Sequence, residues 1–250
     1  MSGLVLPFKD LIDECEAIKG YAGDLLDNKT TDVLASAKGT LQGIQRDGSV
    51  KPVRWCIAED RPLCTKWSDR ASQPGNKGKY RLRAKFSFVW QIRKLDEGKW
   101  RNSKYFLLDG LASSVTTLVA EVDGEEAVLA RWATEVGDAA SPGTHFHFQV
   151  NRPDSDELPF PKSLDIPRLP APPMSPFLAV DFALGEIFQD RWRSDALQVN
   201  QHTNRWNTLQ KQRLVRFFEW QAKRVRESVG SPWMALKLAK PPRELLVEDT

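Results

Sequence analysis

The sequence lacks the short motifs that identify the common enzyme classes. It contains no phosphate-binding loop of the form GxxxxGK[ST], no GxGxxG dinucleotide fingerprint and no GxSxG nucleophile elbow. It has only three histidines and three cysteines, and their spacing forms no zinc-finger or CxxC pattern. Hydrolase, nucleotide-binding and zinc-finger functions therefore have no motif to support them. A nuclease that uses scattered acids, such as Asp109, Glu121 and Glu135, would leave no motif and stays open.

Long hydrophobic runs are also missing. No stretch approaches the roughly 20 apolar residues that cross a bilayer, and the N-terminus lacks the basic start and apolar run of a signal peptide. Cys15, Cys56 and Cys64 are odd in number and widely separated, which disfavours a disulfide framework and is typical of a reducing compartment. We therefore expect a cytoplasmic protein, of a bacterium, with no membrane partner.

The composition is that of an ordinary folded protein. Of the 250 residues, 41% are hydrophobic and 28% are charged, which is enough to bury a sizeable core. Nine tryptophans supply large aromatic side chains for that core or for interfaces. Because the predicted strands and the flanking helices are each too one-sided to fold alone, we predict a single domain over residues 1–250.

Residues 79–94 carry the clearest structural pattern. Apolar side chains occupy the even positions from Tyr80 to Ile92, whereas Arg81, Arg83 and Lys85 occupy odd positions. Side chains on a strand point alternately to opposite faces, so this alternation predicts one long strand with an aromatic face and a basic face.

The sequence predicts further strands and helices before and after this strand. Strands are expected at 53–57, 104–109, 111–122, 126–136 and 144–150, joined by turns such as Asp123-Gly124. Helices are expected at 8–27, 33–45, 176–193 and 203–229. The last helix has a broad stripe formed by Trp206, Leu209, Leu214, Phe217, Phe218, Gln221, Val225 and Val229.

We predict an α+β fold, with an antiparallel β-meander of four or five strands over 79–150. N-terminal helices (1–46) and C-terminal helices (176–230) flank the meander, and a proline-rich strap (152–176) joins it to the latter. The strap cannot be helix or central strand. We expect an extended connection, and a polyproline recognition motif is the alternative.

Positive charge is segregated along the chain, although the net charge is only +3. Ten basic residues and two acids lie in 77–104, and nine basic residues and two acids lie in 191–226. Segregated cations are what a surface for a polyanion needs. The residues we expect to contact nucleic acid or an acidic partner protein are Arg81, Arg83, Lys85, Arg93, Lys211, Arg213, Arg216, Lys223 and Arg224. The alternative is an ordinary solvated surface, with some of these cations paired to the acidic N-terminal helix.

His145 and His147 stand two apart on a predicted strand, so both project from one face. If the loop GDAASPG closes a hairpin, Glu135 lies opposite His145 and Ala133 lies opposite His147. Two histidines and a carboxylate can bind a divalent metal. The alternative is that these histidines only form hydrogen bonds, and we expect no other cofactor.

These patterns favour a non-enzymatic binding subunit of a cytoplasmic multi-protein assembly. Its basic patches would contact nucleic acid or an acidic protein. Two alternatives remain open at this point. One is a metal-dependent hydrolase or nuclease that uses the His-x-His pair, and the other is an obligate oligomer or scaffold with tryptophans in its interfaces.

Overall fold

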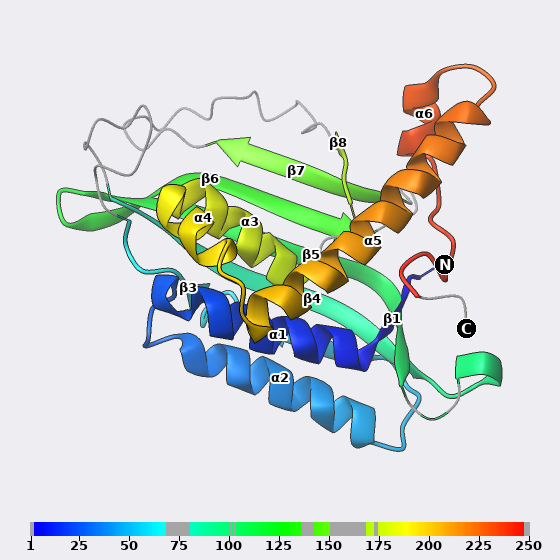
Figure 1. The fold of residues 1–250 in the computed structure, drawn as a ribbon, viewed down its shortest axis with the longest axis horizontal. Helices are drawn as coiled ribbons and strands as arrows, with labels where there is room; N and C mark the ends of the chain where they lie inside the picture. The colour runs from blue at the N-terminus through cyan, green and yellow to red at the C-terminus, as the bar shows by residue number, and fades with distance from the viewer. Residues whose placement is uncertain are drawn as a thin grey trace.

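The chain folds into one antiparallel sheet with helices packed over one of its faces (Figure 1). The computed structural model describes residues 3–68, 81–100, 102, 104–136, 143–150, 169–172 and 175–247. In these ranges the eight strands are β1 (Val5–Pro7), β2 (Val53–Ile57), β3 (Leu63–Cys64), β4 (Leu82–Leu95), β5 (Tyr105–Val122), β6 (Glu125–Val136), β7 (Thr144–Val150) and β8 (Leu169–Pro170). The six α-helices described there are α1 (Phe8–Ala22), α2 (Thr31–Arg46), α3 (Pro176–Phe188), α4 (Asp190–Ala196), α5 (Gln201–Arg226) and α6 (Pro232–Lys237).

The strands follow the order β2-β4-β5-β6-β7-β8, with β1 paired to β5 and β3 paired to β4. The predicted α+β class and the meander β4-β5-β6-β7 are confirmed, because these four strands are consecutive neighbours. The predicted count of four or five strands is too low. Three of the strands missing from that count, β1, β3 and β8, are only two or three residues long. Such short strands show no alternation of apolar and polar residues in the sequence.

Strand β4 has the alternation that the sequence predicted. Its even side chains from Ala84 to Ile92 are buried, whereas Arg83, Lys85 and the following odd positions up to Arg93 stay partly or fully exposed. The buried set faces the helices, since Phe88 contacts both Trp55 of β2 and Phe177 of α3. The basic set therefore lies on the opposite, open face of the sheet.

Strand β5 is one strand of 18 residues, whereas the sequence predicted two strands that divide at Gly110. Gly110 has φ +117°, a conformation that side chains rarely adopt. The pairing with β4 shifts there, from Trp90↔Ala112 to Ile92↔Leu108, so three residues of β5 oppose Gln91 alone. A β-bulge thus bends the strand without ending it.

The predicted helices begin and end within five residues of the predicted bounds, with one division, and the short helix α6 was not predicted. Ser175 caps α3 by accepting a hydrogen bond from the Leu178 amide at 3.0 Å. The helix expected over 176–193 divides into α3 and α4 at Gln189, which has φ +44°. Asn200 and Thr203 form a capping box that starts α5.

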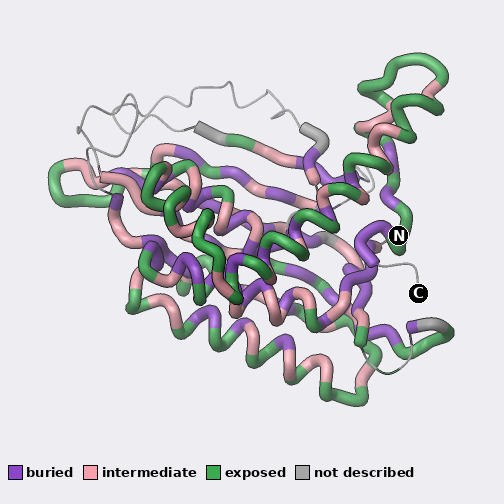
Figure 2. The backbone as a smooth tube through the Cα atoms, in the orientation of Figure 1, coloured by how far each residue is buried: buried purple, intermediate pink, exposed green. Residues whose placement is uncertain are grey.

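A continuous hydrophobic core joins the N-terminal helices, the covered face of the sheet, α3 and α5. Figure 2 shows its buried stretches running through these elements. Trp55 lies at its centre, with its ring centroid 4.6 Å from that of Phe88 and 6.2 Å from that of Phe177. Most of the predicted strap, residues 152–168 and 173–174, lies outside the described residues. That residues 1–250 form a single domain stays a prediction. None of the described helices is long and apolar enough to cross a membrane.

Candidate functional site

The predicted basic face of β4 exists, but each of its four named cations lies beside a carboxylate of the neighbouring strands. Arg81 contacts Glu121 at 3.4 Å, and Arg93 contacts Asp109 at 3.1 Å. Arg83 and Lys85 both contact Glu126. Arg83 is the most enclosed of the four, with only 16% of its side chain exposed, and its guanidinium lies over the Trp67 ring at 5.2 Å.

These contacts weaken the argument for a polyanion surface on the sheet. Exposed ion pairs add little to stability, but each carboxylate cancels the local positive potential that attracts phosphate. Whether the β4 cations bind nucleic acid stays a prediction. The sequence alone did not show that Glu121 and Glu126 would lie beside these cations, because both acids come from other strands of the sheet.

Arg213 of α5 does not lie on an exposed surface, because its side chain is only 6% exposed. It forms an ion pair with Glu14 of α1, which is fully buried, and contacts Asp10 at 3.3 Å. Gln210 donates a second hydrogen bond to the same Glu14 oxygen. Burial raises the pKa of Glu14, and the Arg213 charge opposes that rise. The expectation that the acidic N-terminal helix pairs with some of these cations is confirmed for Arg213, and also for Arg205, which contacts Asp13 and Glu16.

The other predicted cations of α5 lie closer to solvent. Lys211, Lys223 and Arg224 are exposed, and Arg216 is partly buried. Lys223 and Arg224 both approach Glu227 at 3.9 Å, in weak contacts within one helical turn. This end of α5 therefore keeps positive charge on its surface.

The broad stripe predicted for this helix is only partly buried. Phe217 is 1% exposed, but Phe218 is 55% exposed and Val225 is 37% exposed. Phe218 and Val225 recur with Val215 and Ala222 at intervals of three and four, and so form a second apolar stripe on a different side of the helix from the buried one. The spacing in the sequence placed Phe217, Phe218 and Val225 in one broad stripe, and could not show which of them would be buried. A shallow depression of about 620 Å³ lies beside the first half of this second stripe, lined in part by Leu214, Val215 and Phe218.

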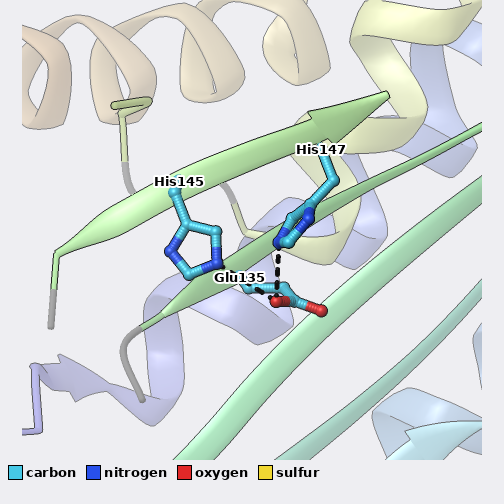
Figure 3. Close-up of side chains that lie close together, drawn as sticks. All are labelled: Glu135, His145 and His147. Carbon is cyan, nitrogen blue, oxygen red and sulfur yellow. Dashed lines mark hydrogen bonds and ion pairs between the residues drawn. The ribbon is translucent and has the colours of Figure 1, made fainter. Parts of the chain in front are cut away.

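Glu135, His145 and His147 converge on the open face of the sheet (Figure 3). The predicted hairpin register is confirmed, because Glu135 pairs with His145 and Ala133 pairs with His147. One carboxylate oxygen, Glu135 Oε2, lies 3.1 Å from His145 Nε2 and 3.0 Å from His147 Nε2. The two imidazole rings lie 4.7 Å apart, centroid to centroid.

Further hydrogen bonds hold this cluster in place. The Nδ1 atom of His145 lies 3.2 Å from the Gly143 carbonyl oxygen, and Ser113 Oγ donates to Glu135 Oε1 at 3.3 Å. His145 is buried, while the side chains of His147 and Glu135 are about 20% exposed. The hydrogen bond from His145, helped by the charge of both histidines, lowers the pKa of Glu135 to about 2 against the effect of burial. Glu135 is therefore a carboxylate at any ordinary pH.

The cluster borders a hollow of about 380 Å³ in the open face of the sheet. Small residues of the central strands, Ser87, Ser113 and Ala133, line its floor, and Glu59 and Arg131 form an ion pair of 2.7 Å beside it. Of the scattered acids considered from sequence, only Glu135 reaches this site. Asp109 and Glu121 pair with different arginines instead.

The chain matches no known protein-family model, and neither a curated protein nor a solved structure shows significant similarity to it.

Proposed function

We propose that the protein is a non-enzymatic binding subunit that docks an acidic partner protein through the exposed side of α5 and α6. The observation that supports this proposal is the apolar stripe of α5 with lysine and arginine side chains around it. We call this surface the α5 arm, and define it as Lys211, Val215, Phe218, Ala222, Lys223, Val225, Arg226, Val229, Trp233, Met234 and Leu238.

The C-terminal turns of α5 and the helix α6 extend beyond the edge of the sheet (Figure 1), and much of their surface is exposed (Figure 2). Val229 is fully exposed where the chain turns, and in α6 Trp233, Met234 and Leu238 are each about half exposed. Folded proteins rarely expose so many large apolar side chains together, and such patches usually mark an interface. Burying one of them removes roughly 1.5–3 kcal/mol of unfavourable hydration.

A protein partner accounts for this surface better than nucleic acid does. A phosphate backbone contacts cationic and polar side chains, and it would not bury the branched apolar side chains of Val215 and Val225. An amphipathic helix, in contrast, packs its apolar face along residues that recur at three and four. The predicted nucleic-acid surface on β4 also has its own carboxylates beside it.

The cations of the α5 arm favour a partner that is acidic. Lys211 and Arg226 stand in line with the apolar stripe at its two ends, and Lys223 stands beside it, all of them exposed. Glu219 and Glu227 are the acids nearby, so positive charge dominates. Complementary charge of this kind accelerates encounter and excludes like-charged partners.

The test uses two synthetic helical peptides with the same leucine spacing, one with glutamates and one with lysines on its polar face. Fluorescence anisotropy should show that the full chain binds the glutamate peptide and not the lysine peptide. Phe218→Glu should abolish that binding. Leu197→Glu is a matched control, because Leu197 is 70% exposed outside the α5 arm.

Three outcomes would contradict the proposal. Binding of duplex DNA or single-stranded RNA that is unaffected by Phe218→Glu would favour a nucleic-acid function instead. A concentration-dependent dimer in light scattering, lost in Phe218→Glu, would mean that a second copy of this chain covers the α5 arm. Equal binding of both peptides would remove the charge argument.

A further inference from the structure

We propose that Glu135, His145 and His147 bind a divalent first-row transition metal ion, with Zn²⁺ as the ion to test first, at the edge of the hollow in the sheet. This site lies on the open face of the strands and does not involve the α5 arm. It is therefore independent of the proposed docking function.

Three ligand atoms already point at one place. The atoms Glu135 Oε2, His145 Nε2 and His147 Nε2 all lie within 4.8 Å of one another. A tetrahedral zinc ion with bonds of about 2.0–2.1 Å holds its ligand atoms about 3.3 Å apart. The two nitrogen–oxygen distances, 3.0 and 3.1 Å, are close to that spacing, and the two histidine nitrogens lie within 4.8 Å of each other. An ion can therefore enter when the carboxylate retreats slightly and the two imidazoles close around it.

The second set of contacts orients these ligands as metal sites require. A histidine that binds metal through one nitrogen usually donates its other N–H to a carbonyl or carboxylate. His145 has that arrangement, since its Nδ1 lies 3.2 Å from the Gly143 carbonyl oxygen. Ser113 in the same way holds the Glu135 oxygen that faces away from the histidines.

The hydrogen bond to Gly143 also decides which nitrogen of His145 is left for a metal ion. A carbonyl oxygen only accepts, so Nδ1 donates to Gly143 and Nε2 is the nitrogen that faces Glu135 Oε2. A metal ion at Nε2 would therefore leave the Gly143 hydrogen bond intact.

The ligand types select the class of metal. Two imidazoles and one carboxylate are the set found with zinc and with non-haem iron, whereas Ca²⁺ and Mg²⁺ prefer oxygen ligands alone. The site supplies a single negative charge, from Glu135, against the two positive charges of the ion.

Three protein ligands leave a coordination position open to water or to a small ligand. Structural zinc sites are usually closed by four protein ligands, while sites that bind substrate keep one position free. Glu135 and His147 themselves line the 380 Å³ hollow, so the open position faces a space that can hold a small molecule.

The test starts with the full chain after chelator treatment and dialysis. Calorimetric titration with Zn²⁺ should give one ion per chain and raise the melting temperature. His147→Ala should lower the affinity by more than the ~10–100-fold that loss of an outer contact costs. His202→Ala is the matched control, because the chain has only three histidines and His202 lies on α5, away from the site.

A second variant and a second probe keep the test decisive if His147→Ala folds poorly. Ser113→Ala removes only the outer hydrogen bond and should weaken Zn²⁺ binding by about 10–100-fold. Co²⁺ should give the visible absorption bands of a low-coordinate nitrogen and oxygen site, absent in Glu135→Gln. Zinc binding that is below one ion per chain, or equal in the wild type and His147→Ala, would overturn the proposal and leave the cluster as hydrogen bonds alone.

Discussion

Arg213 and Glu14 form a buried ion pair that joins α5 to α1 across almost the whole length of the chain. Glu14 has no exposed side-chain surface, and Arg213 has only 6%. The attraction between the two charges offsets the free-energy cost of removing each of them from water. It therefore fixes where the long C-terminal helix lies on the N-terminal one.

Removing one partner of this pair should cost more than the pair itself contributes. Arg213→Met leaves Glu14 buried without its counter-ion, and we expect a loss of about 3–5 kcal/mol in the free energy of unfolding. Urea denaturation measures this loss. Arg224→Met, on the exposed side of α5, is the control and should stay within about 0.5 kcal/mol of wild type. If Glu14→Gln does not recover part of the loss in the Arg213→Met background, the buried charge is not the cause.

Neighbouring phenylalanines on α5 should respond very differently to the same change. Phe217 is 1% exposed and packs into the core, whereas Phe218 is 55% exposed. Phe217→Ala should therefore cost about 3–5 kcal/mol through lost burial and a cavity. Phe218→Ala should change stability by less than about 1 kcal/mol. Thermal and urea unfolding of the two variants checks this. Similar losses in both would mean that Phe218 is covered within the folded chain, and would remove the α5 arm as a free surface.

The alternation of β4 and the register of the β6–β7 hairpin could be predicted because both depend on local sequence. A strand with period two has only two possible faces, and a one-residue slip would bury every arginine of β4. If the loop GDAASPG closes a hairpin between β6 and β7, Glu135 must pair with His145. The structure shows this pairing.

Partners of the charged side chains could not be predicted, because they depend on contacts between distant segments. Glu126 reaches Arg83 and Lys85 through the pairing of β4, β5 and β6, and this pairing includes a register shift next to Val119. The two apolar sides of α5 were equally ambiguous. Periodicity predicted the positions of Phe217 and Phe218 in a helix, but only the packing of α1 decides which side of that helix is covered.

Substitution by alanine should change the stability of the protein in opposite directions at Gly39 and Gly110. Gly110 has φ +117° at the β5 bulge, so Gly110→Ala should destabilise the protein by about 1–3 kcal/mol. Gly39 is exposed inside α2, and an added methyl group there meets no atom within 4 Å. Gly39→Ala should stabilise the protein by about 0.5–1 kcal/mol. Melting temperatures of both variants give the answer. If Gly110→Ala is neutral, the bulge can relax to a conformation open to any residue.

Asp181 of α3 should make stability depend on pH. It accepts hydrogen bonds from Tyr21 and from Trp192, the latter at 2.9 Å. Burial raises its pKa above the ordinary 3.8, and these hydrogen bonds oppose only part of the rise. The folded protein thus holds this proton more tightly than the unfolded chain. The free energy of unfolding must consequently fall as pH increases from the ordinary value through the raised one.

Asp181→Asn isolates this dependence, because asparagine keeps an oxygen that accepts from Tyr21 and Trp192 but does not ionise. Urea unfolding of both proteins should be compared at several values between about pH 4 and pH 7. The variant should gain stability relative to wild type as the pH rises. Asp190→Asn, at an exposed position at the start of α4, is the control for the exchange of a carboxylate for an amide. A difference between wild type and Asp181→Asn that is constant, or that shrinks toward neutral pH, would show that the Asp181 carboxylate is not penalised by its burial.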